Sequence, residues 1–222
     1  MSLSSTARKD IVEVGRRLWL RGLVAGTDGN ISVRLGNNRI LITPSGQPKG
    51  DLSADDLLEV DSDGRLLDGK LPPSSEIAMH LFVYRRRPDI MACVHAHPPY
   101  ATAFAVAGVE PDPNVLPEVV LFIGRIPLTD YAPPGTNAVP GALQPFIGQH
   151  NAFLLRNHGL LTTGRDLQEA YSRHETVEHY CRILHAARQA GPVGTIPDSD
   201  FQRLERMRAQ REQASGGKKT EN

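Results

Sequence analysis

Three histidines in two short segments are the residues of this chain best suited to bind a metal. His95 and His97 end an apolar run and precede two prolines in the segment MACVHAHPPY. Because alternate side chains of a strand share a face, both imidazoles are expected on one side of it. His158 lies in a second strand-like run, AFLLRNHGLL. A lone histidine is more often a packed core or surface residue, but three imidazoles from two separate segments suit zinc, with manganese, iron or cobalt as alternatives.

Glu76 is the carboxylate expected beside this metal. It stands at the predicted start of a helix that runs to about Arg86, so the helix can cross back over the strand that contains His95. Next to an open metal position, a carboxylate acts as a general base or as a ligand that leaves when substrate arrives. The alternative is an acid that stabilises a helix N-terminus. We interpret His80, one turn further along, as a structural residue of a buried stripe.

Three short loops rich in small residues are candidates for a phosphate site. Ser74-Ser75 stands at the predicted helix N-terminus, where free N–H groups and the helix dipole favour an anion. Gly29-Asn30 and Ser45-Gly46 lie at the ends of predicted strands and offer hydroxyl, amide and N–H groups. Such loops are mostly turns when taken singly. The hypothesis depends on their number and their nearness to the predicted metal, and it requires no strong positive charge.

Composition limits the class of protein. The chain has 222 residues, 40% hydrophobic and 23% charged, which is typical of a soluble globular protein with a sizeable core. Its 25 basic residues equal its 25 acidic residues, so the overall charge needed to bind nucleic acid is missing. Two cysteines make no disulfide framework, and no segment resembles a signal peptide or a membrane span. We expect a cytoplasmic protein with neither nucleic acid nor membrane as a partner.

The hydrophobic pattern predicts one α/β domain around a mixed sheet. Residues 1–191 are expected to form this domain, and residues 192–222 a polar C-terminal extension with one helix over 198–213 and a disordered tail over 215–222. The predicted helices of the domain cover 4–22, about 76–86, 100–106 and 166–190. The predicted strands cover 31–35, 39–42, 58–67 with a turn in the middle, 91–97, 119–123, 125–128, 152–155 and 160–163.

Six motifs occur in the order and spacing of the class II aldolase/adducin family, which the chain resembles from about residue 10 to about residue 190. They are Gly-Asn-Ile-Ser-Val-Arg (29–34), Thr-Pro-Ser-Gly (43–46), Pro-Ser-Ser-Glu (73–76), His-Ala-His (95–97), Tyr-Ala-Pro-Pro-Gly-Thr (131–136) and Asn-His-Gly (157–159). Within the family they are most similar to the enzymes that cleave L-fuculose 1-phosphate. The resemblance implies a three-layer α/β/α domain around a mixed, largely antiparallel sheet.

The resemblance also implies an activity. It is the reversible cleavage of a ketose 1-phosphate, L-fuculose 1-phosphate or a related deoxyketose 1-phosphate, to dihydroxyacetone phosphate and a small aldehyde through a metal-stabilised enediolate. Zinc would be held by His95, His97 and His158, and Glu76 would bind the resting metal and then act as the base. The phosphate would be bound by Gly29, Asn30, Ser45, Gly46, Ser74 and Ser75.

Family members are typically C4 homotetramers with active sites between subunits. The tyrosine that matches Tyr131 reaches in from the neighbouring subunit and exchanges a proton with the aldehyde oxygen. The plain alternative for Tyr131 is a packed loop residue. The segment after Gly191 has no tyrosine and only one aromatic residue, Phe201, whereas the enzymes that cleave fuculose 1-phosphate use a tyrosine there.

Other functions within the family stay open as alternatives. A dehydratase or a decarboxylase of sugar phosphates fits the same motifs, whereas a 4-epimerase fits less well because it has aspartate at the position of Glu76. A non-catalytic, adducin-like assembly module is disfavoured because the metal-ligand and base positions are all filled. Glu118, in NVLPEVVLFIGR, is a candidate second proton carrier, although we favour a solvent-facing strand residue.

Overall fold

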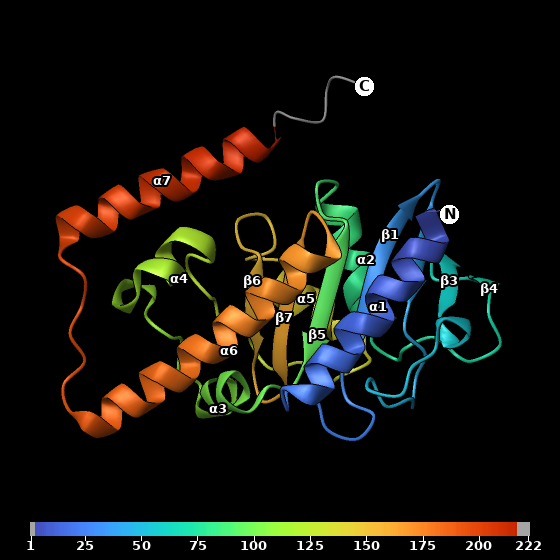
Figure 1. The fold of residues 1–222 in the computed structure, drawn as a ribbon, viewed down its shortest axis with the longest axis horizontal. Helices are drawn as coiled ribbons and strands as arrows, with labels where there is room; N and C mark the ends of the chain where they lie inside the picture. The colour runs from blue at the N-terminus through green and yellow to red at the C-terminus, as the bar shows by residue number, and fades with distance from the viewer. Residues whose placement is uncertain (1–2, 217–222) are drawn as a thin grey trace.

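Seven strands form one sheet in the computed structural model, which describes residues 3–216 (Figure 1). They are β1 (Asn30–Gly36), β2 (Arg39–Ile42), β3 (Leu58–Asp61), β4 (Leu66–Asp68), β5 (Ala92–Ala96), β6 (Ala152–Leu155) and β7 (Gly159–Gly164). Their order is β4-β3-β2-β1-β5-β7-β6, and all of these neighbours pair antiparallel. An isolated parallel bridge joins Leu128 to Leu154 at the edge. The sheet is therefore largely antiparallel, as predicted.

Helices cover both faces of this sheet and make three layers (Figure 1). The helices are α1 (Leu3–Leu20), α2 (Ile77–Arg86), α3 (Pro99–Ala107), α4 (Pro117–Phe122), α5 (Ala138–Leu143), α6 (Leu167–Ala190) and α7 (Asp198–Gly216), with 3-10 turns at Ala54–Asp56 and Pro113–Val115. Helices α1 and α6 pack on one face, and α2 and α5 on the other. Helix α7 lies outside these layers and contacts α4. None of the helices within residues 3–216 is long and apolar enough to span a membrane.

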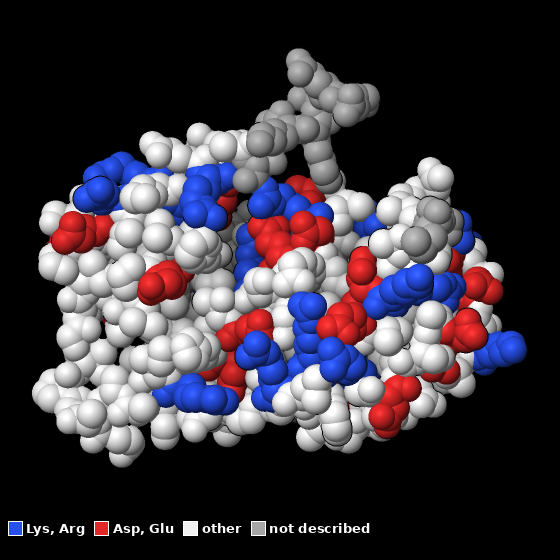
Figure 2. All heavy atoms as spheres, in the orientation of Figure 1, with Lys and Arg blue, Asp and Glu red and all other residues white. Residues whose placement is uncertain are grey.

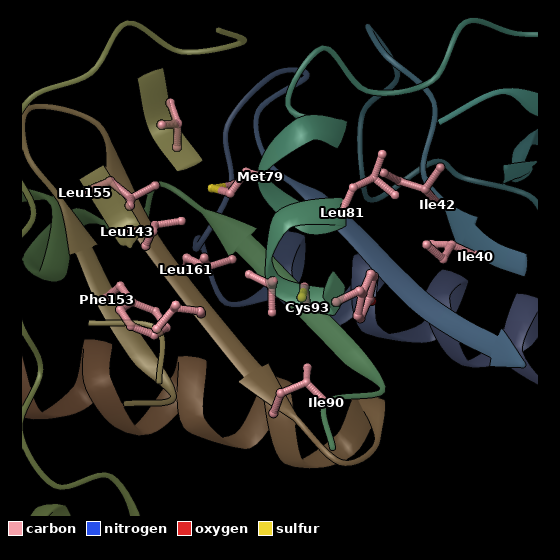
Figure 3. Packing of buried hydrophobic residues seen from close by; sticks show 14 of the residues in the cluster. Ile40, Ile42, Met79, Leu81, Ile90, Cys93, Leu143, Phe153, Leu155 and Leu161 are labelled. Atoms are coloured by element: carbon pink, nitrogen blue, oxygen red, sulfur yellow. The ribbon is translucent and has the colours of Figure 1, made fainter. Parts of the chain in front are cut away.

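The period of two along β5 decides which layer each of its side chains faces. Ala92, Val94 and Ala96 pack with α1 and α6, whereas Cys93 belongs to the apolar cluster beneath α2 (Figure 3). By the same alternation His95 points to the α2 side. All five residues of β5 are buried, so the histidine is carried into the interior by an apolar strand.

Three regions differ from the predicted elements. Residues 125–128 were expected to be a strand, but there only Leu128 pairs, as the isolated bridge to Leu154. Residues 119–123 were expected to be a strand, but residues Pro117–Phe122 form helix α4. A proline and an acid in the first turn favour a helix start, and a short apolar run does not distinguish a buried strand from a buried helix. The prediction of a tail from residue 215 is wrong at its start, because α7 continues to Gly216. The rest of that predicted tail, 217–222, lies outside the described residues.

Helix α3 begins directly after the histidine strand, and a buried acid of α6 holds its first turn. Glu178 accepts hydrogen bonds from the backbone N–H groups of Tyr100 (3.0 Å) and Ala101 (2.8 Å). The first N–H groups of a helix have no partner within the helix, so this carboxylate satisfies them. Burial raises the pKa of Glu178, although the two N–H groups oppose that shift. Glu178 therefore ties the chain that leaves His97 to α6.

Replacing Glu178 by alanine tests this contact. We expect Glu178→Ala to lower the free energy of unfolding by about 2–3 kcal/mol, because the buried N–H groups at the start of α3 lose their acceptor. Glu205→Ala, which removes an exposed acid from α7, is the control and should change that free energy by less than about 0.5 kcal/mol. Urea denaturation measures both variants, and equal effects would contradict the assignment.

Candidate metal centre

The imidazoles of His95, His97 and His158 meet at the end of β5. One ligand atom from each ring lies within 4.8 Å of the others, and the ring centroids are between 4.7 and 5.1 Å apart. Strand β5 contributes His95 and leads into His97, whereas His158 stands in the turn just before β7. Because β7 pairs with β5, two segments far apart in the sequence deliver their histidines to one place. The structure thus brings the three predicted ligands together.

The motif Asn157-His158-Gly159 has a physical reason at each position. Asn157 has a φ of 54°, in the left-handed region that asparagine tolerates better than most residues, and so turns the chain between β6 and β7. Gly159 leaves no room for a side chain: a Cβ there would lie 2.6 Å from the carbonyl oxygen of Ala96 and 2.6 Å from Cδ2 of His97. This close approach sets His158 against the other two rings.

Glu76 faces the same cluster from the start of α2. Its Oε2 is 3.1 Å from Nε2 of His95, and its Oε1 is 3.2 Å from Nε2 of His158. Burial by itself raises the pKa of this carboxyl, but His95, His158 and the side-chain amide of Asn30 outweigh burial and hold the pKa below its usual range. The group is therefore a largely buried, ionised carboxylate.

The polar atoms that face one another here fit a cation. Oε1 of Glu76 and the Nε2 atoms of His95 and His97 are buried without a hydrogen-bond partner among the described residues. Buried acceptors left in this state are costly unless a further group satisfies them. Three imidazoles and a carboxylate form a donor set that suits zinc. These residues would hold the metal, with Glu76 as the ligand that can leave.

Contacts on the far side of the rings orient them. Nδ1 of His95 is 3.0 Å from the carbonyl oxygen of Leu160, so that nitrogen carries the proton and Nε2 presents its lone pair to the centre. Nδ1 of His97 is 3.3 Å from Oδ2 of Asp28. A carboxylate in this position orients the ring of a metal-binding histidine. Burial lowers the pKa of His97, and it lowers that of His158 to about 4, so both rings are neutral near pH 7.

A buried chain of hydrogen bonds fixes Glu76 from behind. Asn30 Nδ2 donates to Glu76 Oε2 (2.9 Å), and Asn30 Oδ1 pairs with Nε2 of His80. Ser32 Oγ pairs with Nδ1 of His80 (2.6 Å) and with the hydroxyl of Tyr84 (2.7 Å). Because Asn30 Oδ1 can only accept, the donors run from Tyr84 through Ser32, His80 and Asn30 to the carboxylate. The pKa of His80 is lowered to about 3 by burial, which keeps this ring neutral and structural, as predicted.

The function of this chain of residues was not predicted from the sequence, although the spacing of the residues was visible there. Glu76, His80 and Tyr84 are four residues apart and lie on one stripe of α2, and Asn30 and Ser32 alternate along β1. Asn30 was expected in the phosphate loops, but its amide is buried and holds Glu76. The contact of Asp28 with His97 was also not predicted. The feature of the sequence that could have indicated it is the glycine-rich loop that contains Asp28.

The three predicted phosphate loops converge beside Glu76. The N–H of Ser45 donates to the carbonyl of Pro72 (3.0 Å), and the N–H of Ser74 donates to that of Thr43 (3.3 Å), so two of the loops are paired. Ser74 Oγ accepts the N–H of Glu76 at 3.3 Å. The third loop is pressed against the histidine strand, because a Cβ on Gly29 would lie 2.7 Å from the carbonyl oxygen of His95. Ser75 and Gly46 are exposed at the mouth of this region.

Two further candidate residues lie away from the centre in the single chain. Tyr131 is 59% exposed, although its loop passes close to Ser75: a Cβ on Gly135 would lie 3.4 Å from the Ser75 carbonyl oxygen. Glu118 is exposed on α4, so it is a surface residue of a helix and not of a strand. It lines a surface cavity together with Arg21 and residues of α6, none of them from the histidine cluster.

Comparisons with known proteins place this geometry in a family. Residues 9–185 match the model of the class II aldolase and adducin N-terminal domain. The chain belongs to this family. A 3-oxo-tetronate 4-phosphate decarboxylase of Haemophilus influenzae is 34% identical over 209 residues, 91% of this chain and 98% of the relative. An L-fuculose phosphate aldolase of Methanococcus vannielii is also 34% identical, over 80% of this chain and 94% of the relative.

A solved structure of an L-fuculose 1-phosphate aldolase superposes with a TM-score of 0.84 at 29% identity, covering 91% of this chain and 95% of the other. The resemblance inferred from the six motifs is thereby confirmed, as is the fold class. Class II aldolases depend on a metal, and His95, His97 and His158 form a candidate metal site. The family acts on phosphorylated sugars, and relatives named for two different reactions match this chain at the same identity of 34%, the decarboxylase over 91% of the chain and the aldolase over 80%.

Removing the carboxylate behind His97 should weaken metal binding. We expect Asp28→Ala to reduce zinc affinity by about 10–100-fold, because the ring loses the acceptor that sets its orientation. Asp51→Ala, which removes an exposed acid from a neighbouring loop, should leave the affinity unchanged. Competition with a chromophoric chelator measures both proteins. Equal zinc affinities would show that Asp28 does not position His97.

Removing the hydroxyl in the middle of the buried chain should destabilise the metal-free protein. Ser32→Ala leaves the buried Nδ1 of His80 without a donor, and we expect a loss of about 1–3 kcal/mol in the free energy of unfolding. Ser172→Ala, on the outer part of α6, removes a hydroxyl that accepts a hydrogen bond from Gln168 at the exposed surface and serves as the control. Denaturant unfolding would contradict the account if the two variants were equally stable.

Proposed function

We propose that this protein is a metal-dependent lyase that reversibly cleaves a ketose 1-phosphate, L-fuculose 1-phosphate or a related deoxyketose 1-phosphate, to dihydroxyacetone phosphate and a small aldehyde. The observation that carries the proposal is the buried cluster in which Glu76 faces His95 and His158 with unpartnered acceptor atoms. The structural and sequence likeness to fuculose phosphate aldolases supports it.

In the proposed reaction the metal ion, Glu76 and the phosphate loops have separate roles. A divalent cation, zinc or else manganese, iron or cobalt, supplies Lewis-acid stabilisation of the negative charge that carbon–carbon cleavage leaves on the substrate. Asn30 occupies Oε2 of Glu76, so Oε1 is the atom that takes or returns the proton at C3. The loops at Gly29, Ser45 and Ser74 hold the phosphate and keep the reacting carbons over the centre.

The assembly proposed is a C4 homotetramer. In the single chain the ring of Tyr131 is largely exposed, which suits a residue that completes the site of a neighbouring subunit and exchanges a proton with the aldehyde oxygen. The fit of its loop near Ser75 supports a position at the rim of the site. The cytosol is the proposed compartment, because Cys93 and Cys181 are buried free thiols.

Decarboxylation of a phosphorylated sugar acid is the second candidate. The 3-oxo-tetronate 4-phosphate decarboxylase of Haemophilus influenzae is matched over 98% of its length. Both reactions break a carbon–carbon bond and leave negative charge next to a carbonyl group, so the same centre serves both. They differ in the leaving group, which is carbon dioxide in one reaction and an aldehyde in the other.

A product assay separates these reactions. The purified protein is incubated with fuculose, rhamnulose, ribulose and 5-deoxyribulose 1-phosphates and with 3-oxo-tetronate 4-phosphate, and the products are identified. We expect dihydroxyacetone phosphate from at least one ketose 1-phosphate. Release of carbon dioxide alone would favour the decarboxylase, and a ketone that keeps all its carbons but loses water would favour a dehydratase. A protein without bound metal and without turnover would be an adducin-like module.

The role of Glu76 has its own test. Glu76→Gln keeps the size of the side chain but removes the base, so kcat should fall by at least about 100-fold while one metal ion per chain is retained. Glu118→Gln, the matched change at an exposed acid, should have kcat close to that of the unchanged protein. Steady-state kinetics and metal analysis are done on the same preparations. Full activity in Glu76→Gln would remove Glu76 from the mechanism.

A further inference from the structure

Lys49 is a buried cation that joins two of the three phosphate loops. Its exposed fraction is 1%, which is unusual for a lysine. The ammonium group donates to the backbone carbonyl of Thr27 (3.1 Å) and to that of Gln47. Thr27 precedes Gly29 in one loop, and Gln47 directly follows Gly46 in the other. One side chain therefore sets the separation of the two loops.

The charge of Lys49 is not neutralised by its hydrogen-bond partners. Both acceptors are uncharged carbonyl groups, and Asp28, the acid that acts on the ammonium electrostatically, contacts His97. Burial lowers the pKa of Lys49 to about 8, so the group is still mostly protonated at pH 7. Burying a charge without a close opposite charge is costly, which points to an anion that arrives later.

The backbone around Lys49 is fixed on α1, so the ammonium group has a defined position. A Cβ on Gly15 of α1 would lie 2.5 Å from the carbonyl oxygen of Lys49. Next to it, a Cβ on Gly50 would lie 2.7 Å from Cγ of Trp19, so both glycines permit close contact between the loop and the helix. A cation held in this way needs little reorganisation when an anion binds.

We propose that Lys49 is a positioning residue for the phosphate group of the substrate. It holds the loops that carry Gly29 and Gly46 together and places a buried positive charge behind them. The inference rests on the proposed function, because it takes these loops to be the phosphate pocket. It also changes the expectation from the sequence that the pocket needs no strong positive charge.

The test compares variants of Lys49 with a surface control in the metal-loaded protein. Lys49→Met removes the charge and the donors, Lys49→Gln removes the charge but keeps N–H donors, and Lys70→Met removes an exposed positive charge. For both Lys49 variants the dissociation constant of inorganic phosphate, measured by calorimetry, should rise at least about 10-fold. The KM of the phosphorylated substrate should rise in parallel, whereas kcat and metal content change little.

Phosphate affinity in the folded Lys49 variants equal to that of Lys70→Met would overturn the proposal. If the variants do not fold, a crystal structure of the unchanged protein with inorganic phosphate decides: the anion should lie within about 6 Å of the Lys49 ammonium group, and an anion bound elsewhere overturns the proposal. Phosphate binding is measured without turnover, so failure of the lyase assay leaves this result intact. Turnover with unaltered phosphate affinity in the variants removes only the role of Lys49.

Discussion

The hydrogen bond from Asn30 to Glu76 is the contact on which the rest of the site depends. It holds Oε2 of a buried carboxylate, which also faces His95, and leaves Oε1 facing His158 without a hydrogen bond. Behind it, His80 and Ser32 continue a chain of donors that all point toward the negative charge. Hydrogen bonds aligned in this way polarise one another and keep the carboxylate in a single orientation. In the proposed function, Glu76 needs this fixed orientation to reach one carbon of the bound substrate.

The sheet explains how such distant residues meet. Strand β1 lies between β2 and β5, and Asn30 is directly opposite His95 in the antiparallel register. On the other side of β5, strand β7 brings the turn that contains His158. Helix α2 crosses this end of the sheet with Glu76 at its start. The apolar cluster beneath α2, part of which Figure 3 shows, fixes the position of the helix on the sheet. It thereby keeps Glu76 within hydrogen-bonding distance of Asn30.

The charges on the surface are arranged differently from those at the candidate metal centre. Figure 2 shows Lys and Arg mixed with Asp and Glu over the visible face, with neither sign alone. Such a surface suits a protein with equal numbers of both charges and gives no wide field for a polyanion. The charges proposed to act on a phosphorylated substrate are instead the buried ammonium group of Lys49 and a metal ion at the histidine cluster.

The fold class followed from the resemblance to the family, and the residues that form the cluster were visible as local patterns, whereas the short apolar run over 119–123 did not distinguish helix from strand. A His-x-His pair on an apolar strand, a carboxylate at a helix start and a glycine after a third histidine are each visible without coordinates. Asp28, Lys49 and the hydrogen bond of Asn30 were not predicted, since each depends on which loop passes behind another.

The central claim, that the three histidines bind a metal ion, is tested most directly by anomalous diffraction from crystals of protein purified without chelator. We predict one metal peak per chain, bonded to His95, His97 and His158, whereas metal-free rings or a peak elsewhere would contradict the account.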